Sequence, residues 1–342
     1  MSPVSSVSNQ PLTHIAVWND QNRHLDYSFI EKVTNFFFFI LNRIISTMVL
    51  PATILYSREQ TRLIEEDFQT RWSSQPFEPL RNNYTTTPIE VTAPDGAKIR
   101  GTYFKNNAAQ NNSPTVICFQ PNAVISKLGV FNWQIAVAAA SKIPFNFVWF
   151  DYRGCGESKP ENSIASTAKD LILDGDSIYQ FVNDKLGVHT NDIHFYGYSL
   201  GGGISTQVKK NHTECEGNHV IERSFSSVND TLYHFLPSLL AYLSGKLFSF
   251  LNWNMASADA LRETKGRTVI VHHPEDPMMK NDASLYRAIF ERGALSTGDI
   301  GHLDLSYWQI SSNNLHCEPL LSFGSAEDSP IMKISEFLFS SP

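Results

Sequence analysis

A serine flanked by glycines is the feature of the sequence that most directly suggests chemistry. Ser199 is the centre of a Gly-x-Ser-x-Gly pattern in FYGYSLGG, residues 195–202, between a stretch typical of a strand and small residues that suit a helix. On so tight a turn, side chains two positions either side of the serine would collide, and Gly197 and Gly201 relieve that crowding. We therefore expect the turn to present the Ser199 hydroxyl as a nucleophile, with the backbone amide of Leu200 directed at a developing oxyanion. The alternative is a purely structural turn.

Short strand signals alternate with helical periodicity from residue 89 onward. This order predicts an α/β fold, in which a mostly parallel sheet is covered by helices on both faces. A hairpin is expected where residues 89–93 and 99–104 flank the turn Pro94-Asp95-Gly96. The further strands are expected at residues 115–119, 147–150, 193–196, 220–221, 268–271 and 305–310. Helices are expected at residues 128–143, 164–186, 283–292 and 331–339. Ser199 would then lie at the carboxyl edge of the sheet.

Two peptides resemble the α/β-hydrolase superfamily. DYRGCGES, residues 151–158, resembles the loop after the fourth strand of these enzymes, and GYSLGG, residues 197–202, resembles their nucleophile elbow. The resemblance extends from about residue 89 to the C-terminus. With its helical preface, the whole chain is similar to the chlamydial CHLPS-type hydrolases and to the SidB-like effector hydrolases of Legionella. The resemblance implies the α/β-hydrolase fold, a serine hydrolase and, for the narrower family, a bacterial effector with a role in virulence.

A serine nucleophile needs a base, and the base needs a carboxylate that orients it. In the α/β-hydrolase family the chain order is nucleophile, acid, base. Residues 268–277, TVIVHHPEDP, read as a strand and a loop, and the placement of Asp276 resembles that of the family's acid. The adjacent Glu275 is an alternative, and a carboxylate that only caps the next helix is the structural interpretation. His272 and His273 are too close to Asp276 in sequence to be the base and are expected to be loop or pocket residues.

Two other histidines compete for the role of base. His316 follows the strand expected at residues 305–310 and precedes the expected final helix, which is where the family places its base. His302 lies in a Gly-His pair familiar from other hydrolases, but residues 296–299 before it make a poor last strand. Choosing His302 would also leave the later strand without a role in the sheet. We therefore predict His316 as the base, with His302 as the alternative.

The second donor of an oxyanion hole is sought in FQPNA, residues 119–123. Relatives commonly show His-Gly-Asn-Ala here, so this chain departs from them at Gln120 and Pro121. Proline has no N–H, so residue 121 cannot donate. The backbone amide of Asn122 or Ala123 remains, and Asn122 is the matching position.

Composition narrows the classes of function. The chain has 342 residues, 42% of them hydrophobic, and 27 Lys and Arg stand against 34 Asp and Glu, a net charge of −7. This balance disfavours nucleic acid as a partner. Four cysteines without CxxC spacing and the absence of a phosphate-binding glycine motif predict neither a metal nor a cofactor. The N-terminus lacks the pattern of a secretory signal peptide.

Two segments are unusually apolar. Residues 33–55 resemble membrane sequence, and residues 29–48 predict a helix with an apolar stripe of Phe29, Val33, Phe36, Ile40, Ile44 and Met48. The opposite face carries Glu31, Asn35, Asn42 and Ser46, interrupted by Phe38 and Phe39. We expect this helix to be buried in the protein or, alternatively, to contact a membrane or a partner. Its longest apolar run is too short to span a bilayer. Residues 232–253, charged only at Lys246, would form an apolar wall or lid over the serine site, or pack on the core.

These observations predict a helical extension at residues 1–86 that packs on an α/β-hydrolase domain at residues 87–342, with a helical cap at about residues 229–260. The expected activity is hydrolysis of acyl esters with lipid or other apolar acyl groups, through Ser199, Asp276 and His316. A thioesterase or peptidase with the same triad is an alternative, and so is a membrane- or partner-binding scaffold with a decayed site. The expected location is the bacterial cytoplasm, or a host cell if the effector resemblance holds.

Overall fold

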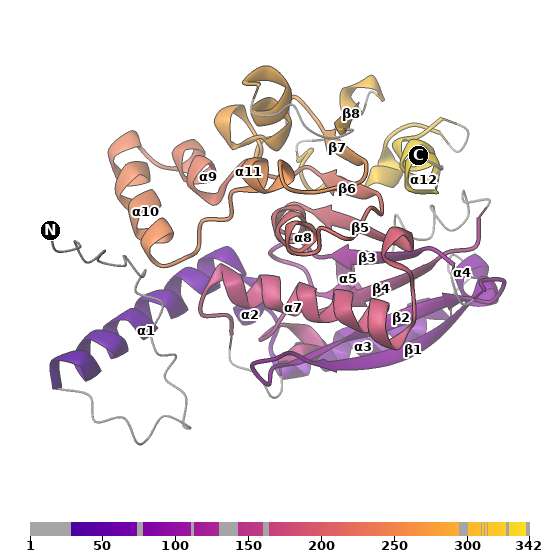
Figure 1. The fold of residues 1–342 in the computed structure, drawn as a ribbon, viewed down its shortest axis with the longest axis horizontal. Helices are drawn as coiled ribbons and strands as arrows, with labels where there is room; N and C mark the ends of the chain where they lie inside the picture. Colours follow the sequence, from indigo (N-terminus) through magenta and orange to yellow (C-terminus); the bar gives the residue numbers. More distant parts are fainter. Residues whose placement is uncertain are drawn as a thin grey trace, which may run out of the picture.

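The computed structural model describes residues 29–73, 78–110, 113–129, 143–159, 164–293, 300–308, 310, 312, 314–325 and 328–339. Its centre is an eight-stranded sheet in the order β1-β2-β4-β3-β5-β6-β7-β8 (Figure 1). The strands are β1 (Tyr84–Thr92), β2 (Lys98–Asn106), β3 (Thr115–Phe119), β4 (Asn146–Phe150), β5 (Ile193–Tyr198), β6 (His219–Glu222), β7 (Thr268–His272) and β8 (Ile300–Asp304). β2 pairs antiparallel with β1 and β4, and every other neighbouring pair is parallel. The expected hairpin and the α/β class are confirmed.

Helices cover both faces of this sheet (Figure 1). They are α1 (Phe29–Val49), α2 (Ala52–Leu55), α3 (Arg58–Trp72), α4 (Glu78–Asn83), α5 (Ser126–Gly129), α7 (Ala168–Gln180), α8 (Leu200–Asn211), α9 (Val228–Phe235), α10 (Ser238–Phe250), α11 (Ser257–Leu261) and α12 (Pro330–Phe339). Alternate residues of β3 serve the two layers: Ile117 and Phe119 pack with α7 and α8, and Val116 and Cys118 pack with α12. A strand buried on both faces must be apolar throughout, which is why β3 was evident in the sequence.

The central strand β3 lies where the order of strand addition reverses along the sheet. The chain passes from β3 to β4 on one side and then back across to β5 on the other. In open α/β sheets, ligands bind beyond the carboxyl ends of the strands at such a switch point. Ser199 follows β5 immediately, so the topology places it at this crevice.

The helices before β1 are anchored to the sheet domain. Leu50 and Ala52 are fully buried in the core that α7 and α8 share. The ammonium group of Lys159 donates to the carbonyl oxygens of Thr53 and Tyr56 at 2.8 and 2.6 Å. β1 begins at Tyr84, so the boundary expected between residues 86 and 87 falls inside a strand. The division into an extension and a hydrolase domain stays a prediction.

The orientation of α1 differs from the expected one. Its polar residues Asn42 and Ser46 face inward and are 6% and 0% exposed, whereas Ile44 and Met48 of the apolar stripe are 52% and 65% exposed. The expectation of an apolar stripe buried in the protein is therefore wrong for the described residues. Asn42 is buried because its side-chain oxygen accepts a hydrogen bond from the indole of Trp253, which follows α10. No helix among the described residues has the length and hydropathy that crossing a bilayer requires.

The last strand also differs from the expected one. β8 is Ile300–Asp304, and the chain then makes a short turn at Leu305–Tyr307 instead of the strand expected at residues 305–310. The apolar pattern arises because Leu305 and Trp308 are buried against the α12 layer as single side chains. Most of the helix expected at residues 128–143 lies outside the described residues.

Candidate active site

The turn between β5 and α8 holds Ser199 in a strained backbone conformation. Its φ is 52° and its ψ is −116°, a conformation that costs an ordinary residue energy and persists only where the surroundings enforce it. A Cβ atom on Gly197 would lie 2.4 Å from the Ser205 hydroxyl, and one on Gly201 would lie 2.2 Å from the Phe119 carbonyl oxygen. Glycine is thus required at both positions: at Gly197 because of crowding within the turn, as the sequence pattern suggested, and at Gly201 because the end of β3 approaches it.

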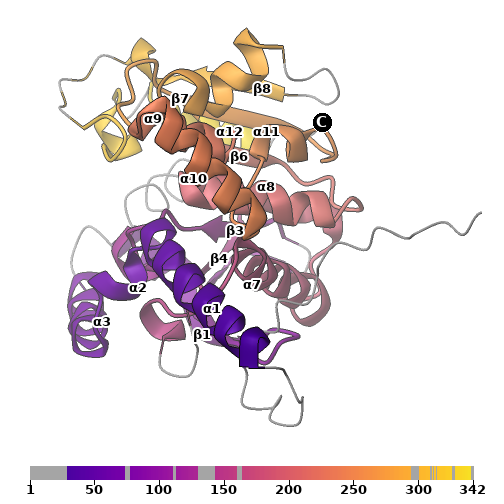
Figure 2. The same ribbon diagram turned by 90° about the vertical axis from the view of Figure 1, so that its left-hand side faces the viewer.

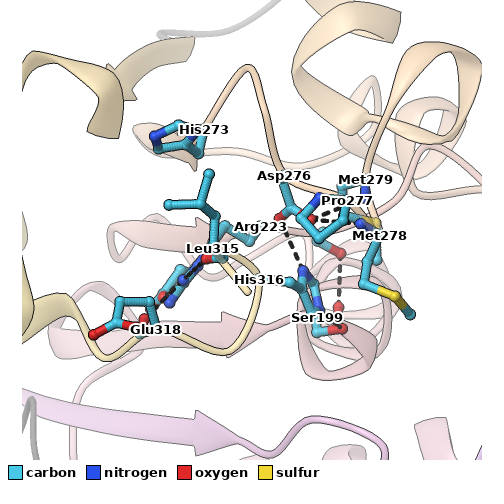
Figure 3. Close-up of polar contacts among 12 residues, drawn as sticks. Ser199, Arg223, His273, Asp276, Pro277, Met278, Met279, Leu315, His316 and Glu318 are labelled. Atoms are coloured by element: carbon cyan, nitrogen blue, oxygen red, sulfur yellow. Dashed lines mark hydrogen bonds and ion pairs between the residues drawn. The ribbon is translucent and has the colours of Figure 1, made fainter. Parts of the chain in front are cut away.

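Ser199, His316 and Asp276 form one chain of hydrogen bonds (Figure 3). Nε2 of His316 lies 3.0 Å from the serine Oγ, and Nδ1 lies 2.8 Å from Oδ2 of Asp276. With Nδ1–H donating to the carboxylate, Nε2 is left to accept the serine proton. All three residues are at least nine-tenths buried, so bulk water competes little for these contacts.

Asp276 is held as a carboxylate by its surroundings. Burial alone would raise its pKa, but the hydrogen bond and the charge of His316 outweigh burial and lower the pKa below its ordinary value. The backbone amides of Met278 and Met279 contribute in the same direction, donating to Oδ1 at 2.8 and 3.1 Å. An ionised Asp276 orients the His316 ring and stabilises its protonated form.

The other candidates for base and acid lie elsewhere. His302 belongs to β8, where Nδ1 is 3.4 Å from Nε2 of His272 and the ring contacts those of Tyr286 and Phe290. Glu275 is exposed on the surface of its loop. The structure therefore brings His316 and Asp276 to the serine, and not these alternatives.

The loop that carries His316 is held from outside by Arg223, which follows β6. Nη1 of Arg223 donates to the carbonyl oxygens of Leu315 and Glu318, the second at 2.8 Å, on either side of the histidine (Figure 3). The hydroxyl of Tyr198 donates to the carbonyl oxygen of His316 itself. Three hydrogen bonds to the backbone of this loop thus fix the position and orientation of the His316 imidazole.

Arg223 is itself fixed by a buried ion pair with Glu222. Both side chains are 2% exposed, and Nε of Arg223 donates to Oε1 of Glu222 at 3.0 Å. The hydroxyl of Tyr196 donates to the same carboxylate. Sequence reasoning missed this network, although two charged residues directly after an apolar strand are a signal that could have drawn attention to it.

We expect the Arg223→Met variant to lose kcat by about 10²-fold, because a displacement of about 1 Å at a reacting group has an effect of that size. It also leaves Glu222 buried without its cation and should lower the free energy of unfolding by about 3–5 kcal/mol. The double variant Glu222→Gln, Arg223→Met removes both charges and serves as the control. Stability should return in it and kcat should not. Recovery of kcat together with stability would contradict a positioning role.

The N-terminal helices hold the loop expected to supply the second oxyanion donor. The backbone amide of Ala52 in α2 donates to the carbonyl oxygen of Asn122 at 3.2 Å, and the hydroxyl of Tyr56 donates to that of Ala123 at 3.1 Å. Asn122 and Leu200 line the same cavity as Ser199. The first amides of a helix have no partner within it, so that of Leu200 is available to an anion.

A mainly apolar cavity of about 500 Å³ opens above Ser199 and His316. The end of α1 contributes Met48 and Val49, and α9 and α10 contribute Leu232, Phe235 and Phe248. The remaining lining residues are Asn122, Leu200, Phe225, Val228, Thr231, Met278, Met279, Asn314 and Cys317. Both apolar segments singled out in the sequence therefore border this site. Among the described residues, no group of three His, Cys, Asp or Glu side chains is placed to hold a metal ion.

This sheet, with a serine on the strand-to-helix turn after β5, is the α/β-hydrolase fold. The chain is 25% identical over 215 residues to the alpha/beta hydrolase domain-containing protein WAV2 of Arabidopsis thaliana, a match that spans 60% of this chain and 67% of that protein. No protein-family model matches it.

Two solved structures support the same assignment of fold. An esterase of Pyrococcus furiosus, Pf2001, matches with a TM-score of 0.50 and 15% identity over 66% of this chain and 83% of its own. DcsB in complex with its substrate analogue matches with a TM-score of 0.52 and 16% identity over 74% of this chain and 98% of its own. At such identities the likeness shows the fold alone. The narrower resemblance to chlamydial and Legionella hydrolases, and the effector role that it implies, gain no support from these matches and stay predictions.

Proposed function

We propose that this chain is a serine hydrolase that cleaves carboxylic acyl esters with an apolar acyl group. The observation that carries the proposal is the chain of hydrogen bonds from Ser199 through His316 to Asp276 at the floor of an apolar cavity. Nucleophile, base and orienting carboxylate are the parts that acyl transfer requires.

In the proposed reaction, Oγ of Ser199 attacks the ester carbonyl carbon while Nε2 of His316 takes its proton. The carbonyl oxygen becomes an oxyanion, which the backbone amides of Leu200 and Asn122 would stabilise. As the tetrahedral intermediate collapses, His316 returns the proton to the leaving alcohol and an acyl-serine remains. Water then attacks the acyl carbon with His316 again as base; the bond to Oγ breaks, His316 returns the proton to Oγ of Ser199, and the carboxylic acid leaves.

The walls of the cavity favour an apolar acyl chain. Val49, Leu232, Phe235 and Phe248 present hydrocarbon to it, and charged side chains among the described residues do not line it, apart from His316 if protonated. Each methylene group moved from water into such surroundings contributes about 0.8 kcal/mol, which corresponds to about fourfold in affinity. Long acyl chains should therefore be preferred while they fit.

The proposal is tested with soluble p-nitrophenyl esters of increasing acyl length. We expect kcat/KM to rise by up to about fourfold per methylene until the cavity is full. The Leu232→Phe variant narrows the cavity and should shift the optimum to shorter chains. Leu63→Phe makes the same change at an exposed position of α3 and should leave the optimum unaltered. Absence of ester hydrolysis by the folded protein would refute the proposal, and a flat profile would refute the acyl pocket.

A further inference from the structure

Helix α1 presents several large apolar side chains to the outside and buries two polar ones. Phe36, Ile40 and Ile44, spaced four residues apart on one face, are 59%, 42% and 52% exposed. Asn42 and Ser46, which would suit water, are buried. A surface helix normally has the reverse arrangement, because exposing apolar side chains to water is unfavourable.

Helix α10 has the same arrangement. Leu239, Leu243 and Phe250 are 71%, 55% and 57% exposed. The residues that it turns toward the protein include Ala241 and Gly245, both buried and small. The third buried residue of α10, Phe248, lines the cavity, so the helix exposes several large apolar side chains and buries one large and two small residues.

The two helices are in contact with each other. Figure 2 shows α1 and α10 side by side on the face turned to the viewer. The indole of Trp253, directly after α10, donates to Oδ1 of Asn42 at 3.1 Å, and the rings of Phe38 and Phe250 lie 5.8 Å apart. We call the outward faces of α1 and α10 the apolar surface; it comprises Phe36, Ile40, Ile44, Leu239, Leu243 and Phe250.

The apolar surface is continuous with the cavity above the serine. Met48 at the end of α1 is 65% exposed and Phe235 at the end of α9 is 50% exposed, and both also line the cavity. An apolar chain could therefore pass from this surface to Ser199 without crossing a polar rim on these two sides. Because the apolar surface adjoins the cavity, the partner that binds this surface should also contain the substrate.

The charges around the apolar surface favour a lipid membrane as this occupant. Arg43 is the only charged residue in residues 33–57, and Lys246 is the only one in residues 231–258, in a chain of net charge −7. Both are exposed. Acidic side chains, which an anionic bilayer would repel, are thus absent from both segments, and two long cationic side chains can reach lipid phosphates while their stems lie in the apolar layer.

We propose that the apolar surface docks on a lipid bilayer and places the mouth of the cavity against it. The substrate would then be an acyl ester drawn from the membrane. This choice of substrate rests on the proposed ester hydrolysis, whereas the docking itself does not. The arrangement is that of a helix pair lying in the interface. Apolar burial dominates and two cations contribute little, so binding should depend only weakly on salt.

The test is sedimentation of the full-length Ser199→Ala protein with phosphatidylcholine vesicles, with and without phosphatidylserine. Two double variants in this background, Phe36→Ser, Ile40→Ser and Leu239→Ser, Leu243→Ser, should each lower the partition coefficient by at least about tenfold, because each removes two large apolar side chains from the bilayer. The control Leu63→Ser removes an exposed leucine from α3 and should bind like the parent.

Further measurements separate this inference from the proposed function. With Ser199 restored, both double variants should hydrolyse soluble short-chain esters at the wild-type rate, which shows that they are folded. Equal vesicle binding by parent and double variants, or none by the parent, would overturn the docking. Sedimentation velocity without vesicles is a further test. If the parent protein is a dimer and the double variants are monomers, the apolar surface is a dimer interface and the docking proposal is overturned. Vesicle binding without ester hydrolysis by the wild type would refute the proposed function and leave the docking intact.

Discussion

Replacement of Ser199 by alanine is expected to lower kcat for soluble esters by roughly 10⁴–10⁶-fold, the size of effect seen when a serine nucleophile is removed. The serine oxygen is the atom that would bind the acyl group in the acyl-enzyme. In the alanine variant, His316 and Asp276 have no nucleophile in its place to activate. Because the side chain is small, the free energy of unfolding should change by no more than about 1 kcal/mol. Rates of p-nitrophenyl ester hydrolysis and a denaturant titration measure the two quantities.

A fluorophosphonate probe makes this result specific to the residue. The wild type should gain one covalent adduct, which mass spectrometry of the digest should place on the peptide that contains Ser199, and Ser199→Ala should gain none. Ser306→Ala, at an exposed serine after β8, is the control and should keep both labelling and activity. Full activity of Ser199→Ala, or an adduct on another serine, would end the assignment of the nucleophile.

The second large effect is expected from His316→Ala, with a loss of kcat of roughly 10³–10⁶-fold. Of the histidines that the structure describes, His316 is the one that contacts both the Ser199 hydroxyl and the Asp276 carboxylate. His302→Ala changes the same residue type on β8, where the ring packs against Tyr286 and Phe290. It should keep kcat within a few fold, apart from any loss of folded protein. Both variants are assayed at equal concentrations of folded enzyme.

The two histidine variants also test how the loop is held. Tyr198 and Arg223 bind backbone carbonyl oxygens, so His316→Ala leaves those contacts in place and should unfold at nearly the wild-type denaturant concentration. A catalytic loss confined to His302→Ala would show that the base had been assigned to the wrong histidine.

Local signals were sufficient where the physics is local. Gly197 was evident because the tight turn excludes a Cβ atom there, and the structure shows the carbonyl oxygen of Gly201 at 2.5 Å from that position. The same pattern identified Gly201, although the atom that excludes a Cβ there is the Phe119 carbonyl oxygen at the end of β3. β3 and β7 were evident because strands buried on both faces are mainly apolar, here with three consecutive apolar residues or more. The fold class followed from the order of such elements.

Features that depend on contacts between residues far apart in the sequence could not be predicted in this way. Residues 305–310 are apolar enough to suggest a strand, yet the chain makes a short turn at Leu305–Tyr307, and Leu305 and Trp308 pack in the core beside α12. The burial of Asn42 depends on the indole of Trp253, about two hundred residues later, and no local pattern announces it. Arg223 binds backbone carbonyl oxygens 92 and 95 residues later in the sequence. Such partners become visible only when the chain is folded.

The attachment of the His316 loop through its backbone has a consequence for evolution. Arg223 and Tyr198 donate hydrogen bonds to the backbone carbonyl oxygens of Leu315, His316 and Glu318. Every amino acid has such a carbonyl group. Neighbouring side chains can therefore vary without loosening the imidazole, and two of them, at positions 314 and 317, line the cavity. We expect a mutational scan of residues 314–318 to tolerate many substitutions at these two positions and few at 316. New substrate preferences can then arise on this loop while the catalytic alignment is inherited unchanged.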